Sequence, residues 1–444
     1  MATQGLGHPT CALVVAMCLI CASSAPAQVL PIPPAPRNLE EENLSFPPRS
    51  HAPAWERVPT QERGNEGLSS STSPVHAIFE PATGYVDDFR VWARANYVLS
   101  WVREEQGNLP LVTTGDPKNK VPGAIGQPGT TVLFGDAGIG FRTASGMRLT
   151  LGTWINAEST IGIEAAGFGT EQRANDFFTA SDITGNPLLA VPFINQTTQP
   201  PGPSAHVISN PLKTTGDVLV AASLQRWGVD VSGIYCFWRQ SGAEFSVLAG
   251  MRYEDLLEGL RILQHSLTIS TKTNTTFDDH FNTRNQFFGA QAALRFHWQH
   301  DIWVFDATSK VAVGTTHQVV NIQGDSSQFG AKAAPMGSFS GGLFTQPSNI
   351  GQTAANPAVA IPSLELKLAY QLTPRLRVFA GYEVLYWNQV VRPSDQIDRN
   401  INLSQSVLLG TTQGLLSGPA QPAPLFHRSG FWAQEMNFGM EFRF

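Results

Sequence analysis

Apolar residues recur at every second position over long stretches of the chain. From residue 89 to residue 101 every odd-numbered position is apolar, and Arg90, Arg94 and Asn96 lie between them. Successive side chains of a β-strand point to opposite faces, so this segment has one apolar and one polar face. Soluble strands average about five or six residues, whereas roughly nine to eleven tilted residues cross a bilayer. The pattern therefore predicts long strands with one continuous apolar face.

The same alternation closes the chain. Trp432, Met436, Phe438, Met440, Phe442 and Phe444 share one parity. In a soluble protein so hydrophobic a terminal strand would be an exposed edge prone to aggregation, whereas in a closed barrel it pairs with the first strand. A terminal aromatic preceded by alternating apolar residues also resembles the signal that the bacterial outer-membrane insertion machinery recognises. The candidate insertion signal is Phe438, Met440, Phe442 and Phe444.

Composition argues against a helical membrane protein and against a protein that binds nucleic acid through a broad basic surface. Only 14% of the 444 residues are charged, against roughly 25% in soluble domains, yet the longest uncharged apolar run, residues 11–22, is too short for a membrane helix. A net charge of −6 argues against a broad basic surface for nucleic acid.

Tryptophans at the ends of expected strands suit the interfacial girdles of a membrane barrel. Those tryptophans are Trp101, Trp298, Trp303, Trp387 and Trp432.

We therefore expect an all-β fold, a closed antiparallel transmembrane β-barrel of about 12–14 strands. The expected strands cover residues 89–102, 132–142, 146–156, 159–170, 218–238, 243–254, 257–272, 281–298, 301–321, 362–372, 375–391 and 430–444. An even count puts both chain ends on the periplasmic side and the long connections 103–131, 322–361 and 392–429 outside. The long connection 171–217 falls on the periplasmic side in this count, which indicates a misassigned strand between 146 and 238.

The chain divides into three parts. Residues 1–27 are expected to be a cleavable signal peptide, because an apolar stretch is followed by small residues and an Ala-x-Ala site; a buried N-terminal helix is the alternative. Residues 28–84 contain ten prolines and are expected to be a disordered periplasmic segment. Residues 85–444 form the barrel, in the cell outer membrane. Only Cys236 remains after the signal, which rules out a disulfide framework.

Several segments resemble a known family. They read VRPSDQIDRNIN at 391–402, FWAQ at 431–434, NFGMEFRF at 437–444, GMRYEDL at 250–256 and RLTLGTW at 148–154. They are similar to the BBP7 family of outer-membrane β-barrel porins, found mainly in planctomycete-type bacteria. The resemblance covers roughly residues 85–444. It implies a barrel and an outer-membrane location, and it supplies no substrate and no catalytic residues.

The expected barrel strands place charges of both signs opposite the lipid-facing side chains. The candidate lumen-lining residues are Glu365, Lys367, Arg377, Glu383, Glu441 and Arg443. We expect no catalytic residue, no cofactor and no metal, and therefore no enzyme, because nucleophile, Walker and His-Glu-x-x-His motifs are missing. His297, His300 and Asp301 are interpreted as polar residues of a turn, and Asp395, Asp398 and Arg399 as a salt-bridged loop.

Three functions remain open. The first is a passive channel for small solutes in the outer membrane. The second is a structural or adhesive surface barrel that conducts nothing, because polar residues can fill a narrow interior as an ion-pair network. The third is a secreted soluble β-sandwich binding module. The expected partners are outer-membrane lipid, the barrel-insertion machinery and, for a channel, small solutes, with no nucleic acid; a homo-oligomer stays open.

Overall fold

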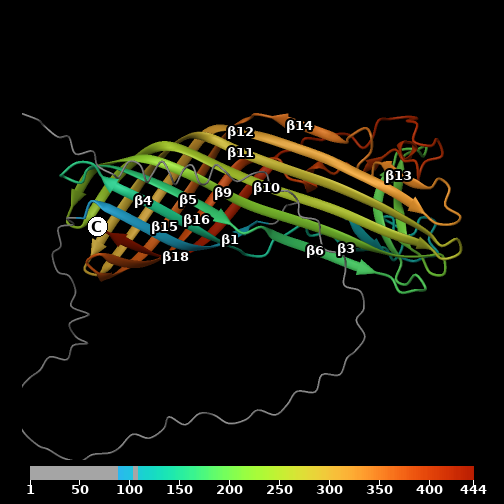
Figure 1. Cartoon of the computed structure of the whole chain (residues 1–444), viewed down its shortest axis with the longest axis horizontal. Coiled ribbons are helices and arrows are strands. Elements are labelled where there is room, and N and C mark those ends of the chain that lie inside the picture. The colour runs from blue at the N-terminus through green and yellow to red at the C-terminus, as the bar shows by residue number, and fades with distance from the viewer. Residues whose placement is uncertain (1–88, 104–108) are drawn as a thin grey trace, which may run out of the picture. The chain divides into compact units, whose positions relative to one another are not determined.

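The computed structural model describes residues 89–103 and 109–444, and within them a 13-stranded antiparallel sheet dominates (Figure 1). The expected signal peptide and proline-rich segment lie outside the described residues. In the described part, ten of the strands form a ring. They are β1 (Val91–Val102), β4 (Ala144–Trp154), β5 (Ile161–Thr170), β9 (Thr214–Gln240), β10 (Ala243–Thr268), β11 (Thr273–His300), β12 (Trp303–Phe329), β15 (Ala358–Thr373), β16 (Leu376–Val390) and β18 (Ser429–Arg443).

The ring closes between its first and last strands. β1 and β18 pair antiparallel from Trp92 opposite Arg443 to Val102 opposite Ala433. Beyond that register the backbone N–H of Phe444 donates to the carbonyl of Val91 at 2.9 Å. The hydrophobic terminal strand is therefore not an edge, which confirms the closed antiparallel barrel.

Two of the expected strand assignments are wrong. Residues 132–142 do not enter the ring: β3 (Thr131–Phe134) ends before Gly135 and Gly138, whose φ angles of 101° and 85° turn the chain away. Residues 243–254 and 257–272 are not two strands but one, β10. The closed ring therefore has ten strands and not the expected 12–14. The misassigned strands do not lie between 146 and 238. Without residues 132–142 in the ring, the connection 171–213 lies at the same end as the other long connections.

β10 continues through two successive carboxylates because each has its own cations. Glu254 points to the interior and pairs with Arg226 and Arg252, at 2.8 and 2.6 Å. Asp255 points outward and pairs with Arg284 at 2.6 Å. A strand separates neighbouring side chains onto opposite faces, so the two negative charges do not meet.

The four longest strands, β9 to β12, have 27, 26, 28 and 27 residues and extend beyond the rest of the ring. The short turns after β4, β9, β11 and β15 lie at the end of the barrel that also holds Phe89 and Phe444, whereas the short turn between β10 and β11 lies at the other end. The connections after β1, β5, β12 and β16 all lie at the opposite end, called the distal end below. There the main sheet is extended by β6 (Arg173–Ala180), β13 (Gly337–Ser340) and β14 (Gly351–Ala355).

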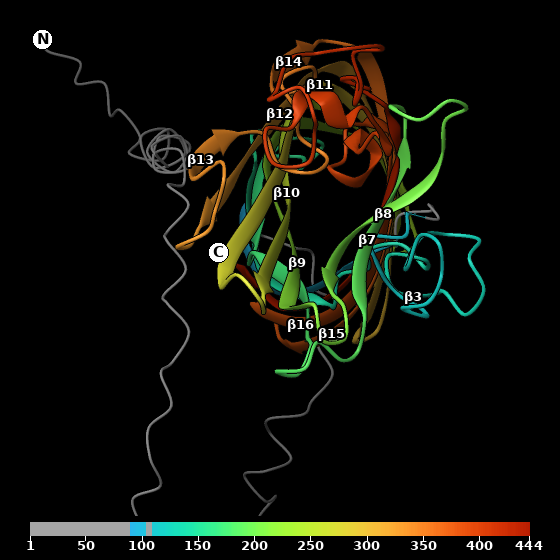
Figure 2. The same cartoon turned by 90° about the vertical axis from the view of Figure 1, so that its right-hand side faces the viewer.

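A second sheet occupies the distal end (Figure 2). It consists of β17 (Asn400–Ile401), β7 (Leu189–Asn195), β2 (Val112–Thr114) and β3, with β8 (Gly202–Ser209) beside β7. Its apolar side chains pack against the inner face of β9–β12 and the folded-in segment at 343–344. The largest cluster of buried hydrophobic residues lies here and includes Val191, Phe193, Ile262, Phe281 and Phe344. The distal interior is packed like the core of a soluble domain.

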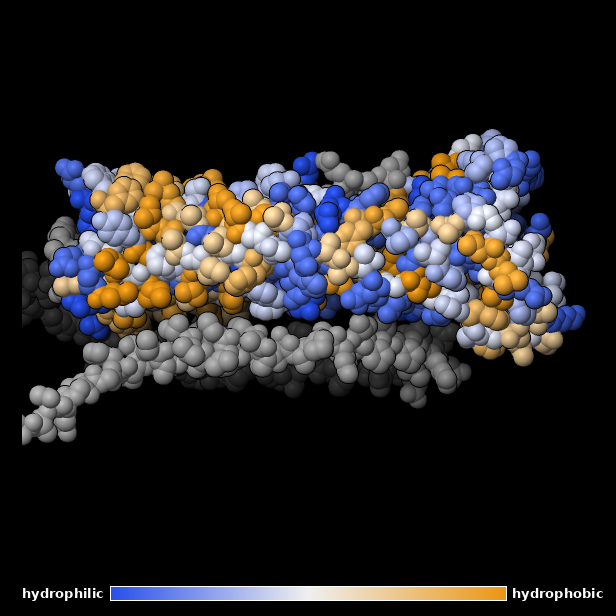
Figure 3. All heavy atoms as spheres, turned by 90° about the horizontal axis from the view of Figure 1, so that it is seen from above, coloured by the Kyte–Doolittle hydropathy of each residue, from blue (hydrophilic) through white to orange (hydrophobic). Residues whose placement is uncertain are grey.

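The other half of the barrel has an apolar outer surface, the apolar band, visible as the orange side of Figure 3. On β18 the outward residues run from Trp432 to Phe444 and are all at least 39% exposed, apart from Gln434. The twelve steps from Trp432 to Phe444, at ~3.3 Å each and tilted by ~40°, give a height of roughly 30 Å, the thickness of a bilayer core. Contiguous exposed apolar surface of this size needs a lipid environment.

Aromatic pairs flank the apolar band at both ends. Toward the distal end Trp227 lies 5.2 Å from Tyr253 and Tyr386 lies 4.5 Å from Trp432; at the other end Trp303 lies 5.2 Å from Tyr370. Trp387 does not belong to a girdle, contrary to expectation: its parity on β16 points it inward, and it is fully buried. Among the described residues, no helix has the length and apolarity to span a bilayer.

Candidate functional site: the ion-paired interior

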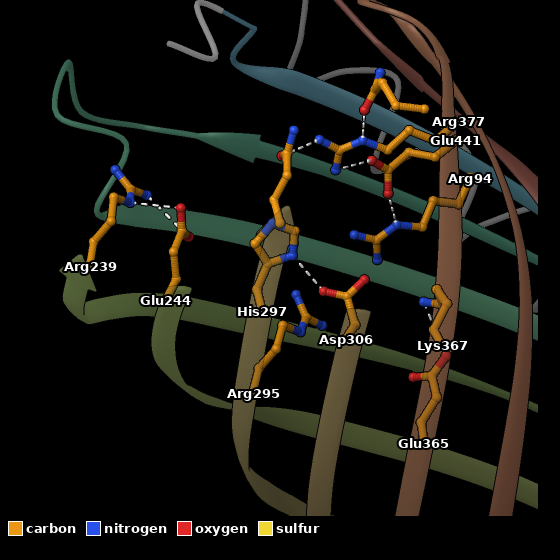
Figure 4. Close-up of polar contacts among 12 residues, drawn as sticks. Arg94, Arg239, Glu244, Arg295, His297, Asp306, Glu365, Lys367, Arg377 and Glu441 are labelled. Carbon is orange, nitrogen blue, oxygen red and sulfur yellow. Dashed lines mark hydrogen bonds and ion pairs between the residues drawn. The ribbon is translucent and has the colours of Figure 1, made fainter. Parts of the chain in front are cut away.

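Charged side chains from most of the ring strands meet inside the barrel at the level of the apolar band. Near the short turns, Arg94 of β1 contacts Glu441 and donates to Glu164 at 3.1 Å, and Arg295 of β11 also donates to Glu164 at 2.8 Å. His297 Nδ1 lies 2.6 Å from Oδ1 of Asp306. Figure 4 shows Arg94 directed toward Glu441 and His297 directed toward Asp306, each pair from different strands.

The six candidate lumen-lining residues take part in the same network. Lys367 lies 3.2 Å from Glu365, Arg377 lies 3.6 Å from Glu441, and Arg443 lies 2.6 Å from Glu441. Glu383 accepts from Arg148 at 2.5 Å. Lys367, Arg377, Glu383 and Glu441 are buried. These side chains are therefore bound to one another.

One wall of the barrel carries a row of three glutamates. The strand register sets Glu365 of β15 opposite Glu383 of β16, and Glu383 opposite Glu435 of β18. Like charges opposite one another on neighbouring strands repel. The row is stable only with cations against it. Lys367 of β15 itself pairs with Glu365, whereas the cations for Glu383 and Glu435 come from elsewhere on the ring.

The facing wall supplies those cations. Arg148 of β4 donates to Glu383 and, at 3.1 Å, to Glu435. Arg226 of β9 contacts Glu435 and donates to Glu254 at 2.8 Å. In the ring order, β1, β4 and β5 lie between β18 and β9, so the contact between Arg226 and Glu435 crosses the interior. An acidic wall and a basic wall thus meet in the middle of the barrel.

A loop residue caps this network on the distal side. Arg392 follows β16, and its Nε and Nη2 donate to Glu258 Oε1 of β10 at 3.1 and 2.7 Å. The Asn285 amide of β11 makes two hydrogen bonds to the backbone of Val391: it accepts from the N–H at 2.8 Å and donates to the carbonyl at 2.9 Å. The segment after β16 therefore enters the barrel and is fixed there.

Several of these residues were not among the sequence-based candidates. Glu164, Arg148, Arg226 and Glu435 all have the inward parity of their strands, so strict alternation would have found them. Glu258 and Arg392 could not be paired in this way, because they are 134 residues apart and Arg392 lies in a loop.

The two candidate chemical motifs do not form sites. His297 is paired inside the barrel, whereas His300 is exposed at the turn and stacks on Trp298 with ring centroids 5.8 Å apart. Asp398 accepts from the backbone of Asn400 and Ala423 at 2.9 and 2.8 Å. Asp395 accepts from the Ser429 hydroxyl at 2.7 Å. No cluster of three or more metal-ligating side chains occurs in residues 89–103 and 109–444.

The residues proposed as the insertion signal lie on the outer face of β18 and at its end. Phe438, Met440, Phe442 and Phe444 are all exposed in the apolar band, and the rings of Phe442 and Phe444 are 4.7 Å apart. Their exposure is that of lipid-facing side chains.

A closed antiparallel ring with an apolar band, aromatic girdles and a polar interior is a transmembrane β-barrel of the outer-membrane type. The family model described as "Putative beta barrel porin-7 (BBP7)" matches residues 92–444. The chain belongs to this family. No curated protein matches.

Solved structures of outer-membrane proteins show a distant likeness. The outer-membrane protease OmpT of Escherichia coli is 8% identical, with 82% of this chain and 99% of that chain covered and a TM-score of 0.35. A Pseudomonas aeruginosa FadL homologue is 10% identical, with 80% and 90% covered and a TM-score of 0.20. The toluene transporter TodX of P. putida is 8% identical, with 84% and 93% covered and a TM-score of 0.18.

Proposed function

We propose that this protein is a non-conducting outer-membrane barrel that anchors its distal β-domain and displays it outside the cell. The observation that carries the proposal is the contact of the acidic wall with the basic wall, above all Arg226 with Glu435 across the ring. Barrels of about eight strands are filled by their side chains, whereas porins of about 16–18 strands leave an aqueous channel. A ten-stranded ring lies near the filled limit.

Two further layers support a sealed interior. Arg392 and Asn285 hold the segment after β16 inside the barrel, and the hydrophobic cluster around Phe281 and Phe344 fills the distal half. A solute would have to break buried ion pairs and then cross an apolar core. Separating a buried ion pair costs several kcal/mol for each charge left without a partner.

The described part of the chain also contains a structure suited to display. β9–β12 continue beyond the apolar band and carry a second sheet with its own core. A rigid β-domain that rests on a filled barrel is a stable support for binding surfaces. We propose that the protein acts by display rather than by catalysis, with outer-membrane lipid and the barrel-insertion machinery as its partners.

The second candidate is a porin-like passive channel for small solutes, which the description of the family favours. A channel requires Arg148 and Arg226 to separate from Glu383 and Glu435. The two candidates therefore differ in whether small solutes pass through the barrel.

Solute release from liposomes tests the proposal. Refolded protein is inserted into liposomes loaded with a small fluorescent dye, and an established open porin serves as the positive control. We expect dye retention equal to that of protein-free liposomes. Insertion is verified by resistance to extraction with carbonate. Dye release in proportion to the amount of inserted protein would favour the channel, and removal of the protein by carbonate would favour a soluble module.

A further inference from the structure

The distal end carries a polar groove that the sealed barrel does not use. It has a volume of about 410 Å³ and lies between the turn at 181–183 and the ends of β9, β10 and β11. Its polar lining includes Asp182, Asp217, His265, Asn274 and Thr276. This part of the main sheet is well beyond the apolar band, so the groove faces solvent and not lipid.

A histidine–aspartate pair forms the centre of the groove. His265 of β10 and Asp217 of β9 are opposite one another in the strand register, and Nδ1 lies 3.0 Å from Oδ1. The hydrogen bond to Asp217 raises the pKa of His265. It also fixes the orientation of the imidazole ring, which leaves Nε2 as the nitrogen for a ligand. About half of the His265 side chain is exposed.

Apolar side chains also line the groove, among the polar ones. Ile183 is 90% exposed, and Ala180 and Leu267 also line the space. Phe178 is 63% exposed on the outer face of β6, two residues before Ala180. Ala180 pairs with Asp217, so Phe178 is the diagonal neighbour of Asp217, at about 7–8 Å. Phe178 does not line the groove itself, and its exposed side chain lies next to the groove on β6, which pairs with β9.

This combination matches the chemistry of a sugar ring. A pyranose has an apolar C–H face that stacks on an aromatic side chain, and an edge of hydroxyl groups that both donate and accept. The carboxylates of Asp182 and Asp217, the Asn274 amide, the Thr276 hydroxyl and the His265 imidazole offer complementary partners. A groove of this volume suits two or three sugar units better than a long polymer.

We infer that the groove formed by Asp217, His265, Asn274 and the neighbouring Phe178 binds a saccharide. The inference deepens the proposed function, because it gives the displayed domain a ligand class. A binding measurement tests it without reference to conduction, so the two proposals can fail separately.

The experiment uses the full chain, refolded in detergent, with maltotriose, chitotriose and a galactose trisaccharide as titrants in calorimetry. We expect one of them to bind. His265→Ala and Phe178→Ala should each weaken that binding at least tenfold, whereas Phe178→Trp should keep it. His317→Ala is the matched control: His317 is an exposed histidine on β12 whose Nδ1 lies 2.7 Å from Oδ1 of Asn356, away from the groove.

Folding of each variant is verified by the shift in gel mobility between unheated and heated barrel. If His265→Ala misfolds, Asp217→Asn replaces it, because this substitution keeps the side-chain shape and removes only the charge. Absence of binding by all three trisaccharides at millimolar concentration would overturn the inference. Binding that survives both His265→Ala and Phe178→Ala would also overturn it, since the sugar would then sit elsewhere.

Discussion

Arg392 donates from Nη2 to Glu258 Oε1 at 2.7 Å, and both side chains are buried inside the barrel. The pair joins a loop to the wall of β10 across 134 residues of sequence. It is the point at which the charged interior of the membrane-spanning half meets the packed distal domain. Because the Arg392–Glu258 pair lies between the membrane-spanning half and the distal domain, its removal should destabilise both.

Arg392→Ala should destabilise the folded barrel by about 3–5 kcal/mol, because it leaves the Glu258 carboxylate buried beside no guanidinium. Urea unfolding in detergent, followed by tryptophan fluorescence, measures the loss. Arg239→Ala is the control: Arg239 lies 2.8 Å from Glu244 in an exposed pair and should cost less than about 1 kcal/mol. Equal midpoints for the two variants would contradict this assignment.

Arg148→Met should uncover the glutamate row, since Glu383 and Glu435 then face one another without this arginine. We expect a loss of about 3–5 kcal/mol. The double variant Arg148→Met with Glu383→Gln should lose less than the sum of the single variants, with a coupling of about 1–3 kcal/mol. Additive losses in the same unfolding assay would show that the two side chains act independently.

Met440→Arg should weaken the membrane-inserted barrel by about 2–4 kcal/mol, because Met440 lies on the outer face of β18 within the apolar band. Leu212→Arg is the matched control: Leu212 is 81% exposed at the distal end, and a cation there should change stability by less than about 0.5 kcal/mol. The measurement is unfolding from lipid vesicles. A loss of stability for Leu212→Arg as large as that for Met440→Arg would show that the apolar band is assigned to the wrong part of the barrel.

Acid should strengthen the distal domain through Asp279. Burial raises the pKa of this carboxyl to about 6, although Phe344 and Thr345 donate backbone N–H groups to it at 2.9 Å. A folded-state pKa above the unfolded value means that the folded state binds the proton more tightly. The stabilisation of the folded state by the protonated Asp279 carboxyl is therefore fully present below about pH 4 and is lost as pH rises through 6. It amounts to at most about 3 kcal/mol.

Other carboxylates of the barrel also titrate, so the effect of Asp279 has to be isolated by difference. The free energy of unfolding of Asp279→Asn minus that of the wild type should increase between pH 4 and pH 7.5, because only the wild type loses the stabilisation by the protonated carboxyl. A difference that stays constant over this range would show that Asp279 is not buried as described.

The barrel could be predicted from the sequence because alternation is a local property. The outward faces of β1, β15, β16 and β18 follow directly from residue parity, and so does the closure by the C-terminal strand. The parity also assigns Trp387 to the interior, but its position near a strand end suggested a girdle. At Glu254 and Asp255 the sequence shows only two adjacent charges. The arginines that stabilise them lie on three strands: Arg226 on β9, Arg252 on β10 itself and Arg284 on β11.

The distal domain was much harder to foresee. β2, β7 and β17 are short, and β7 pairs with β2 across 77 residues and with β17 across 206, so no period marks them as one sheet. The inward turn of the segment after β16 depends on Glu258 and Asn285, which lie on strands remote in sequence. The His265–Asp217 pair likewise arises only when β9 and β10 are aligned in register.

Single-channel recording distinguishes a sealed barrel from an open channel. Refolded full-length protein is inserted into a planar bilayer in about 1 M salt, with an established open porin as the positive control for insertion. With the acidic wall bound to the basic wall, we expect a baseline without discrete current steps after insertion has been verified. Reproducible steps of uniform size from the wild-type protein would contradict the sealed interior.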